Sequence, residues 1–363
     1  MADFNRPVHA LLGLPLDAVS SKQALEKLER AKSQRERCFM STPNLNFLVA
    51  STTNEGFRAS VCRSDLSVAD GMPLVWLARL LGIPIRERVA GSSLFEALGH
   101  RPGSPWRVFF FGGEQGAAMQ AFLQTAKTAS IEPVGLLYPG FGSVADMSDA
   151  ELIDIINASE ADFLVVSLGA AKGQEWISCN LHRLTPPVIS HLGAVVNFVA
   201  GTIKRSPRWL QKIGLEWLWR IKEEPQLWRR YLKDGRALLA LLGTRVLPLM
   251  ILQMIGSPSK TAVSKTRLVC EHDSGEMRVR ISGPMVSGNL QPLRQSLTRL
   301  QEHPCRVVIN LLDCTWVDSA SCGLLMVLDT WLSDQNLSLH LHGASRTVRR
   351  LLLLYGVPAR VWV

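Results

Sequence analysis

Cys38-Phe39-Met40-Ser41-Thr42-Pro43-Asn44-Leu45-Asn46 opens the stretch that decides the fold, which continues to Leu94. A short apolar run comes first here, and polar residues follow it directly. The same order recurs where Leu66 to Ala69 is followed by Asp70-Gly71, and a turn precedes the cluster from Arg86 to Gly91. A lone Asp-Gly indicates only a turn. Three such clusters in sequence are typical of strand ends that carry a ligand site.

Length and composition predict a chain with room for two domains. The sequence has 363 residues, of which 47% are hydrophobic and 20% are charged, so buried cores are expected. The seven cysteines form neither a Cys-x-x-Cys pair nor a zinc-ligand spacing. The N-terminal residues show no charged-then-apolar signal peptide. We therefore expect a cytoplasmic protein with reduced thiols.

Residues 1–205 alternate between strand and helix patterns. Short apolar runs at Val108 to Phe111, Phe163 to Leu168 and Val188 to Leu192 predict strands, and Ser21 to Ala31 predicts a helix capped by Ser20 or Ser21. Uninterrupted apolar strands are typical of parallel sheets covered on both faces. We expect an α/β fold with a doubly wound, mostly parallel, Rossmann-like sheet. The polar strand ends would then meet at one edge: Thr42, Asn44, Asp70, Gly112, Gly113, Gly169 to Gln174, Gly193 and Ala194.

Most of the net charge of +9 lies in one segment. Between Lys204 and Arg236 there are ten Lys or Arg residues and four acidic residues, which leaves +6 in that segment. A local surplus of this kind indicates one anionic partner. Four of the ten tryptophans lie among these arginines. Three interpretations stay open: nucleic-acid binding, a membrane interface, or amphipathic helices packed on the core.

The segment from Ala237 to Ser259 is apolar except for Arg245 and Gln253. Its uncharged runs of 8 and 14 residues are shorter than the roughly 20 residues that cross a bilayer, so we predict no single crossing. An interfacial or re-entrant segment and a buried helical hairpin both stay open. Residues 257–266 have the composition of a linker. We divide the chain into an α/β core (1–205), a basic, Trp-rich helical appendage (206–256), this linker, and a smaller α/β domain (267–363).

The last part of the chain has its own strand and helix pattern. Strands are expected at Leu268 to Cys270 and Met277 to Ile281, joined by a hairpin turn. Further strands are expected at Arg306 to Leu311 and Ser338 to Leu341, and helices at Asn289 to Gln301, Gly323 to Leu332 and Ser345 to Leu354.

Thr42-x-Asn44, Ala69-Asp70-Gly71 and Glu87-Arg88-Val89-Ala90-Gly91, in this order and spacing, resemble the WecG/TagA/CpsF family of bacterial glycosyltransferases. The resemblance implies an inverting, metal-independent enzyme. It would move an N-acetylmannosamine-type sugar, its uronate, or glucose from a UDP-sugar to an undecaprenyl-diphosphate-linked saccharide in surface polysaccharide synthesis. It implies no cofactor. Onto the active site it maps Thr42, Asn44, Asp70, Arg88 and Gln174, with Gly71 in the second motif and Gly112 and Gly113 holding the nucleotide-sugar. Ala171, Gly173 and Asn197 depart from the family's usual residues.

Residues 206–235 resemble the C-terminal appendage of the same family. The resemblance implies that the appendage closes over the site, presents arginines to the nucleotide diphosphate, and brings the protein to the inner face of the membrane. It also implies a tendency to self-associate. The arginines assigned to substrate in this way are Arg220, Arg229 and Arg230, and Arg205 is assigned because Lys204-Arg205-Ser206-Pro207 resembles the family's Arg-Ala-Pro.

Val317-Asp318-Ser319-Ala320 before an apolar helix resembles the STAS domain of anti-sigma-factor antagonists. The resemblance implies a protein partner and a regulatory phosphosite at Ser319, where a phosphoryl group would add negative charge at a helix start. Asp318 and Ser319 would also serve simply as the cap of that helix, and both interpretations stay open.

The residues themselves indicate how transfer would proceed. Asp70 is the carboxylate that combines a strand end with apolar neighbours, which would raise its pKa and make it a better base. Thr42, Asn44 and Asn46 suit sugar hydroxyls and an acetamido group. No Asp-x-Asp occurs, so we expect arginines rather than a metal ion to neutralise the diphosphate. We expect no nucleic-acid partner. The competing hypothesis is a non-catalytic regulatory or scaffold protein that acts through its STAS-like domain.

Overall fold

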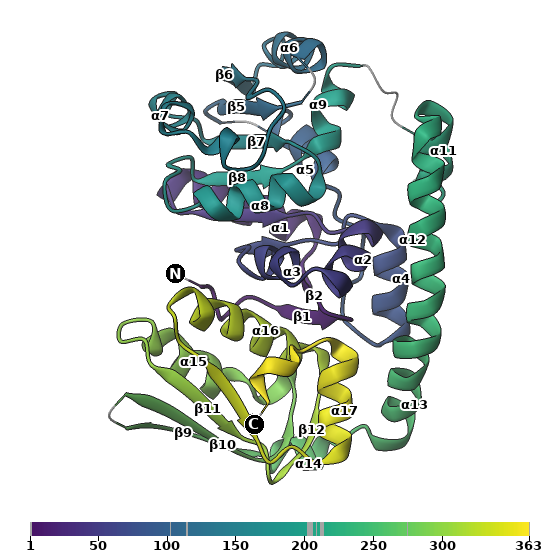
Figure 1. The fold of residues 1–363 in the computed structure, drawn as a ribbon, viewed down its shortest axis with the longest axis vertical. Coiled ribbons are helices and arrows are strands. Elements are labelled where there is room, and N and C mark those ends of the chain that lie inside the picture. The colour runs from purple at the N-terminus through teal and green to yellow at the C-terminus, as the bar shows by residue number, and fades with distance from the viewer. Residues whose placement is uncertain are drawn as a thin grey trace.

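The computed structural model describes residues 2–362 except 102, 114, 202–205, 208, 211–213 and 274. It contains two separate sheets, joined by a small hairpin and by a long helix that runs along one side of the molecule (Figure 1).

The first sheet has six strands, all parallel, in the order β4-β3-β8-β7-β5-β6. The predicted fold class is therefore confirmed. The runs predicted as strands are buried because helices cover both faces of the sheet. Its strands are β3 (Cys38–Ser41), β4 (Leu66–Ser67), β5 (Trp106–Gly112), β6 (Ile131–Leu137), β7 (Phe163–Ser167) and β8 (Val188–His191).

Two helical layers cover this sheet, and each has its own apolar cluster. The first layer packs beneath β3 and β5, and the second packs on the opposite face. Helix α1 begins at the predicted cap, Ser20, which forms a capping box with Gln23. The first layer contains α1 (Ser21–Gln34), α5 (Gly91–Leu98), α6 (Gln115–Thr125) and α9 (Gly193–Val199), and the second contains α7 (Ala150–Ala158) and α8 (Ala170–Asn180).

The second sheet has the order β12-β10-β11-β13, with β9 antiparallel to β10. The register pairs Asp273 with Glu276, as the predicted hairpin requires. Helices α15 (Gln291–Leu300), α16 (Ser319–Asp334) and α17 (Arg346–Tyr355) accompany this sheet. Its strands are β9 (Arg267–Asp273), β10 (Glu276–Met285), β11 (Arg306–Asn310), β12 (Cys314–Val317) and β13 (Leu339–His342).

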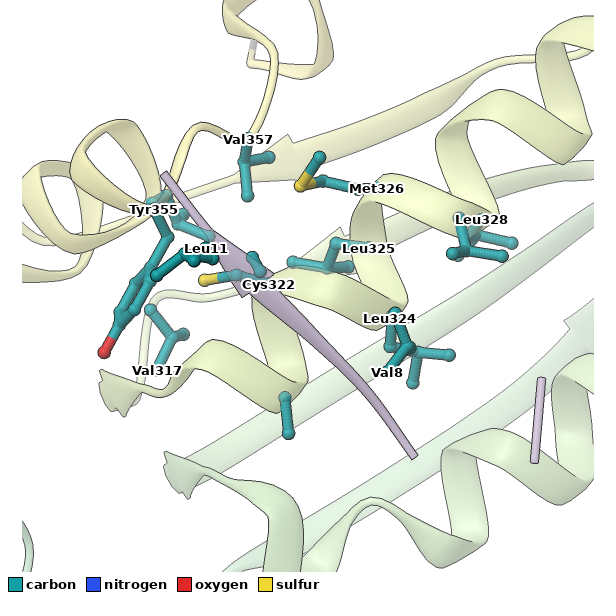
Figure 2. Packing of buried hydrophobic residues seen from close by; sticks show 14 of the residues in the cluster. Val8, Leu11, Val317, Cys322, Leu324, Leu325, Met326, Leu328, Tyr355 and Val357 are labelled. Atoms are coloured by element: carbon teal, nitrogen blue, oxygen red, sulfur yellow. The ribbon is translucent and has the colours of Figure 1, made fainter. Parts of the chain in front are cut away.

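A hairpin near the N-terminus joins the two sheets. Strands β1 (Val8–Leu11) and β2 (Leu14–Asp17) turn at Leu12 and Gly13, which both have positive φ as a two-residue hairpin requires. Helix α16 packs on β1, and 13 of its 16 residues are buried. Figure 2 shows Val8 and Leu11 among side chains of α16 and α17. One continuous apolar cluster thus includes the hairpin, helices α2 (Leu45–Thr53) and α4 (Met72–Leu80), and the second sheet.

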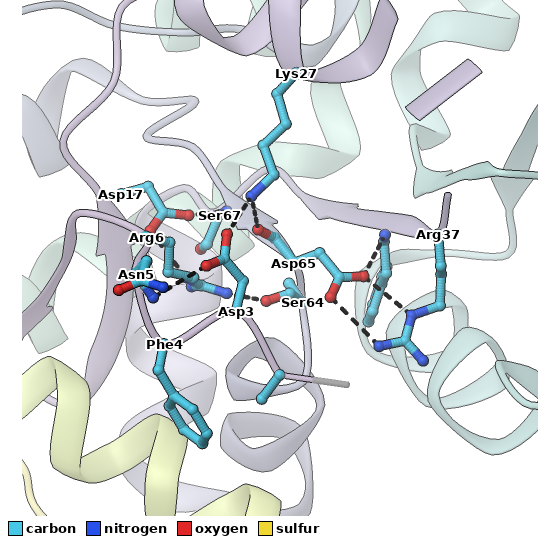
Figure 3. A network of polar contacts seen from close by, with 12 residues as sticks. Asp3, Phe4, Asn5, Arg6, Asp17, Lys27, Arg37, Ser64, Asp65 and Ser67 are labelled. Carbon is cyan, nitrogen blue, oxygen red and sulfur yellow. Dashed lines mark hydrogen bonds and ion pairs between the residues drawn. The ribbon is translucent and has the colours of Figure 1, made fainter. Parts of the chain in front are cut away.

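Buried polar contacts fix the other side of this hairpin to the first sheet (Figure 3). Arg6 pairs with Asp17 at 2.9 Å, and both side chains are almost fully buried. The second Asp17 oxygen accepts the backbone N–H of Ser67 at 2.7 Å. Arg63, the residue that follows α3 (Glu55–Cys62), also pairs with Asp334 at the end of α16. The Asp17–Ser67 hydrogen bond therefore joins the hairpin to β4 of the first sheet, and the buried ion pair, which is costly to break, holds Asp17 in place.

The long helix begins after α11 (Glu216–Glu223). It runs through a 3-10 turn (Pro225–Leu227), α12 (Trp228–Leu241), a π-helical segment (Leu242–Val246) and α13 (Leu247–Gly256) without a break. A helical hairpin over 237–259 is therefore wrong. The π-helical segment ends just before Pro248, in the first turn of α13, so the helix accommodates the proline instead of ending there. Residues 257–266, predicted as a linker, include the short helix α14 (Lys260–Ser264).

This helix contacts both halves of the molecule on one side and is exposed on the other. Arg245 donates to the Leu12 carbonyl, and Gln253 donates to the Leu81 carbonyl and the Tyr355 hydroxyl. By length and composition alone, residues 225–256 are long and apolar enough to cross a membrane, and little of their most apolar part is buried. Its large exposed apolar side chains are Trp228, Leu232, Leu239, Leu247, Ile251, Met254 and Ile255.

Candidate active site

A cavity of about 1730 Å³ lies where the strands of the first sheet end. Helices α11 and α12 form its other wall, so the appendage covers the edge of the sheet that the sequence predicted as a site. Most of the predicted site residues line this cavity: Thr42, Asn44, Asn46, Asp70, Gly71, Arg88, Gly112, Gly113, Arg220 and Arg230.

Asp70 follows β4, and its backbone N–H donates to the Pro43 carbonyl at 2.7 Å, which holds the first two motifs together. Its carboxylate accepts one backbone hydrogen bond, from Gly91 at 3.2 Å. Burial raises the pKa of Asp70 to about 7, against the opposing effects of Arg88 and the Gly91 N–H. A carboxylate of this kind exchanges a proton near neutral pH, as general-base catalysis requires.

Arg88 lies between two carboxylates. Its Nε is 3.5 Å from Asp70 Oδ1, and its Nη1 is 2.6 Å from Glu216 Oε2. The Nε is buried and makes no hydrogen bond within the part of the chain that the structure describes. Arg88 is therefore held mainly by Glu216 on α11, and its contact with Asp70 is the weaker of the two.

The three polar residues of the first motif have different surroundings. Thr42 is buried at the cavity wall. Asn44 caps α2 by accepting the backbone N–H groups of Asn46 and Phe47. The amide of Asn46 donates to Asp234 of α12 at 3.4 Å, so it also joins α2 to the appendage.

The two glycines after β5 have positive φ values of 87° and 84°. A side chain on Gly112 would meet Leu168 at 2.6 Å, and the Gly113 N–H donates to the Ser167 carbonyl at 2.7 Å. Only glycine combines this conformation with such a close approach. Backbone atoms therefore form this part of the cavity wall.

Two predicted residues that the structure describes, Gln174 and Arg229, are not at the cavity wall. The Gln174 side chain is fully buried and donates to the Ser41 hydroxyl at 2.6 Å, so it lies behind the wall. Arg229 is exposed, with its guanidinium over the ring of Trp228. Arg205 lies outside the described residues. Of the motif around Gln174, Lys172 does line the cavity.

Several positively charged side chains, all of them Lys or Arg, line the cavity wall. Arg220 pairs with Glu224 at 2.6 Å, and Arg230 lies over the ring of Tyr231. Across the described ranges, no three His, Cys, Asp or Glu side chains are grouped as metal ligands. The cationic side chains of the wall are Arg88, Lys172, Arg220, Arg230 and Arg236.

Two buried polar residues of this wall, His191 and Ser167, were not predicted from the sequence as site residues. Both are 8% exposed, and neither His191 Nε2 nor Ser167 Oγ has a partner among the described residues. Burial lowers the pKa of His191 to about 4, so the imidazole is neutral. A polar residue that ends an apolar strand was the available signal. His191 also explains Gly173, because a side chain at 173 would meet the imidazole at 2.2 Å.

The predicted phosphosite lies far from this cavity, under the N-terminal hairpin. Ser319 is 7% exposed, and its hydroxyl lies 2.9 Å from His9 Nδ1 of β1. Asp318 caps α16 by accepting the Ser321 N–H at 2.8 Å, which confirms the capping interpretation for the aspartate. A phosphoryl group on Ser319 would need β1 to move away.

Comparison with known proteins finds two family models in this chain. The model of the glycosyl transferase WecG/TagA/CpsF family matches residues 9–248, and a model described as Mlab, STAS domain matches residues 269–359. Among solved structures, a murine solute carrier 26 family member A9 anion transporter in the inward-facing state is 12% identical and covers 86% of this chain and 66% of its own. Its TM-score of 0.22 is too low to bear on the fold.

Two characterised relatives carry the same name, N-acetylglucosaminyldiphosphoundecaprenol N-acetyl-beta-D-mannosaminyltransferase. The protein from Bacillus spizizenii is 28% identical over 210 residues, which cover 58% of this chain and 80% of the relative. The protein from Staphylococcus aureus strain MRSA252 is 25% identical over 215 residues, which cover 58% and 82%.

Proposed function

Because the chain belongs to the glycosyl transferase WecG/TagA/CpsF family, we propose that it transfers an N-acetylmannosamine-type sugar from a UDP-sugar to a lipid-linked N-acetylglucosaminyl diphosphate. The names of the two relatives support this choice of sugar and acceptor. The observation that carries the proposal is Asp70, a carboxylate at the cavity wall whose pKa is raised to about 7.

In the proposed reaction Asp70 accepts the proton of the acceptor hydroxyl. The hydroxyl oxygen attacks the anomeric carbon from the face opposite the departing UDP, so the configuration inverts. The leaving diphosphate gains negative charge as its bond to the sugar breaks, and arginine side chains stabilise it by charge-assisted hydrogen bonds. Arg88, Arg220 and Arg230 are available for this on the cavity wall.

Thr42 and the Gly112-Gly113 turn are proposed to hold the nucleotide-sugar, with Gln174 supporting them from behind. Gln174 donates to Ser41, the residue before Thr42, so its loss would act on the wall rather than on the substrate. Asn44 and Asn46 face the cavity while they also cap α2 and hold α12.

We also propose that the long helix brings the protein to the cytoplasmic face of the membrane, as a peripheral protein. The exposed apolar residues Leu247, Ile251 and Met254 recur at spacings of four and three residues, which places them on one helix face, whereas Trp228, Leu232 and Leu239 also line the cavity. Exposed basic residues, including Arg229 and Lys233, lie nearer the start of the same helix. Such a face suits an interface with anionic lipid headgroups.

The activity is tested with the purified full-length chain, UDP-N-acetylmannosamine and N-acetylglucosaminyl-diphosphoundecaprenol. Mass spectrometry should show one added N-acetylhexosamine on the lipid with wild type and none with Asp70→Asn. UDP-glucose and the uronate donor are run in parallel to identify the preferred sugar. Equal product from wild type and Asp70→Asn would contradict the proposed base.

Membrane association is tested by sedimentation with vesicles that contain anionic lipid. Met254 and Ile255 are 85% and 82% exposed, so Met254→Glu with Ile255→Glu should reduce binding without unfolding the chain. Binding that these two changes leave intact would contradict the assigned face.

A further inference from the structure

We propose that Glu216 is a positioning residue, which couples the docking of helix α11 to proton transfer at Asp70 by holding Arg88 between the two carboxylates. This inference rests on the proposed function, because it concerns the same base. Glu216 does not touch the reacting atoms in this account and acts through Arg88.

The geometry of the three side chains carries the inference. Arg88 Nη1 lies 2.6 Å from Glu216, whereas Arg88 Nε lies 3.5 Å from Asp70. All three side chains are largely shielded, with 14% of Arg88, 24% of Asp70 and 23% of Glu216 exposed. Charges interact strongly where water is excluded. The more closely Arg88 pairs with Glu216, the less it stabilises the ionised carboxylate of Asp70.

An arginine fully paired with Asp70 would stabilise the carboxylate and make it a poor base. Glu216 opposes that effect in two ways. It engages Arg88 at the shorter distance, and its own negative charge disfavours the ionised form of Asp70. Among the described residues, the charged groups that shift the pKa of Asp70 are Arg88, which lowers it, and Glu216, which raises it. The carboxylate of Asp234, which also lines the cavity, is instead influenced by Asn46, Arg230 and Lys233.

Glu216 reaches Arg88 only when α11 is seated on the core. It is the first residue of that helix, and the preceding Gly214, with φ of +75°, lies against α4. A side chain at 214 would meet the Trp76 ring at 2.6 Å, so the chain passes this point in close contact. The Glu216–Arg88 ion pair therefore makes proton transfer at Asp70 depend on whether the appendage covers the cavity.

A purely structural role for Glu216 predicts a different result from the positioning role. If Glu216 only anchors α11, Glu216→Gln would lower turnover or weaken substrate binding and leave the pH dependence unchanged. In the positioning role, the neutral amide frees Arg88 to pair with Asp70. The pKa of Asp70 then falls, and the acid limb of kcat against pH moves to lower pH.

The experiment compares kcat between pH 5 and 9 for the full-length wild type, Glu216→Gln, Glu216→Asp and Glu224→Gln. Glu224→Gln is the matched control, because Glu224 forms an ion pair of the same length, with Arg220, at the other end of α11. We expect the acid limb of Glu216→Gln to move down by about one pH unit. Glu216→Asp should show a smaller shift in the same direction, and Glu224→Gln none.

An acid limb that stays at the wild-type pH in Glu216→Gln overturns the inference, whatever happens to the rate. If Glu216→Gln is too slow to measure, an unshifted limb in Glu216→Asp overturns it equally. Failure of the proposed function has a different signature, because the wild type itself would then show no transfer or no acid limb.

Discussion

Asp70 and Asp318 occupy the same kind of place in the two halves of the molecule, and the comparison separates a reactive carboxylate from a structural one. Each follows an apolar strand and precedes an apolar helix. Asp318 accepts the backbone N–H groups of Ser321 and Ser287, both at 2.8 Å, and its helix is covered by β1. Asp70 accepts one longer hydrogen bond and faces a cavity.

The difference lies in what surrounds each carboxylate rather than in the local sequence. A carboxylate whose oxygens accept backbone N–H groups at the start of a helix contributes to stability as a cap. A carboxylate that is shielded from water with few donors resists ionisation, and it is available to take a proton from a substrate. Substitutions at the two positions should therefore have opposite consequences for activity and for stability.

The largest effect is expected for Asp70→Asn. Loss of a general base should reduce transfer by about 10²- to 10⁴-fold, measured as initial rate with saturating donor and acceptor. The fold should not weaken. Folding raises the pKa of Asp70, so ionising the carboxyl at pH 8 costs stability that the neutral amide does not lose. A lower melting temperature of Asp70→Asn than of wild type at pH 8 would indicate that Asp70 has a structural role, as Asp318 does.

Gly323→Ala should destabilise the contact between α16 and the hairpin. The added carbon would lie 2.9 Å from the His9 carbonyl carbon and 3.0 Å from the Ala10 nitrogen, which are backbone atoms that cannot move aside. We expect a loss of about 1–3 kcal/mol in the free energy of unfolding, from denaturant titration of the full chain. Gly243→Ala is the control, because nothing lies within 4 Å of that added carbon. It should be neutral or stabilising.

Asp318→Ala removes the cap of α16. The expected cost is about 0.5–2 kcal/mol of unfolding free energy, read from the same titration. Transfer activity per folded molecule should stay at the wild-type level, because Asp318 lies far from the cavity residues. A loss of activity without a loss of stability would show that Asp318 influences the cavity. That result would contradict a purely structural role for Asp318.

Ser319→Ala should have the smallest effect. It removes the contact with His9 and leaves a buried ring nitrogen without that partner, at a cost of about 0.5–1.5 kcal/mol. We expect hydrogen–deuterium exchange to rise in β1 and at the start of α16, and not in the helices beside the cavity. Unchanged exchange at β1 would mean that the His9 contact contributes nothing to docking.

Much of the fold could be predicted from local pattern, and the failures have physical reasons. Cys38–Ser41 and Phe163–Ser167 are uninterrupted apolar strands, and they were recognisable as such. Strand β6 was not, because it contains Pro133 and Gly135, and of its residues only Ile131 is buried. The β1–β2 hairpin was missed because its turn, Leu12-Gly13, lacks the usual Asn-Gly or Asp-Gly signal.

The site was predictable where its residues follow strands in sequence, and not where contacts join distant segments. Asp70 and Arg88 belong to recognisable motifs, and both line the cavity. Glu216 lies 128 residues after Arg88 and pairs with it only through the docking of α11. The buried helical hairpin considered for residues 237–259 does not form, because a π-helical segment lets the helix continue past Pro248, a residue that ordinarily ends a helix.

The most direct test of the account is the pH dependence of transfer by the wild-type chain between pH 5 and 9. Asp70 must be ionised to accept a proton, so kcat should fall about tenfold per pH unit below an inflection near pH 7. Residual transfer by Asp70→Asn should lack that inflection. A wild-type rate that is flat from pH 5 to 8, or the same inflection in Asp70→Asn, would contradict the assignment of Asp70 as the base.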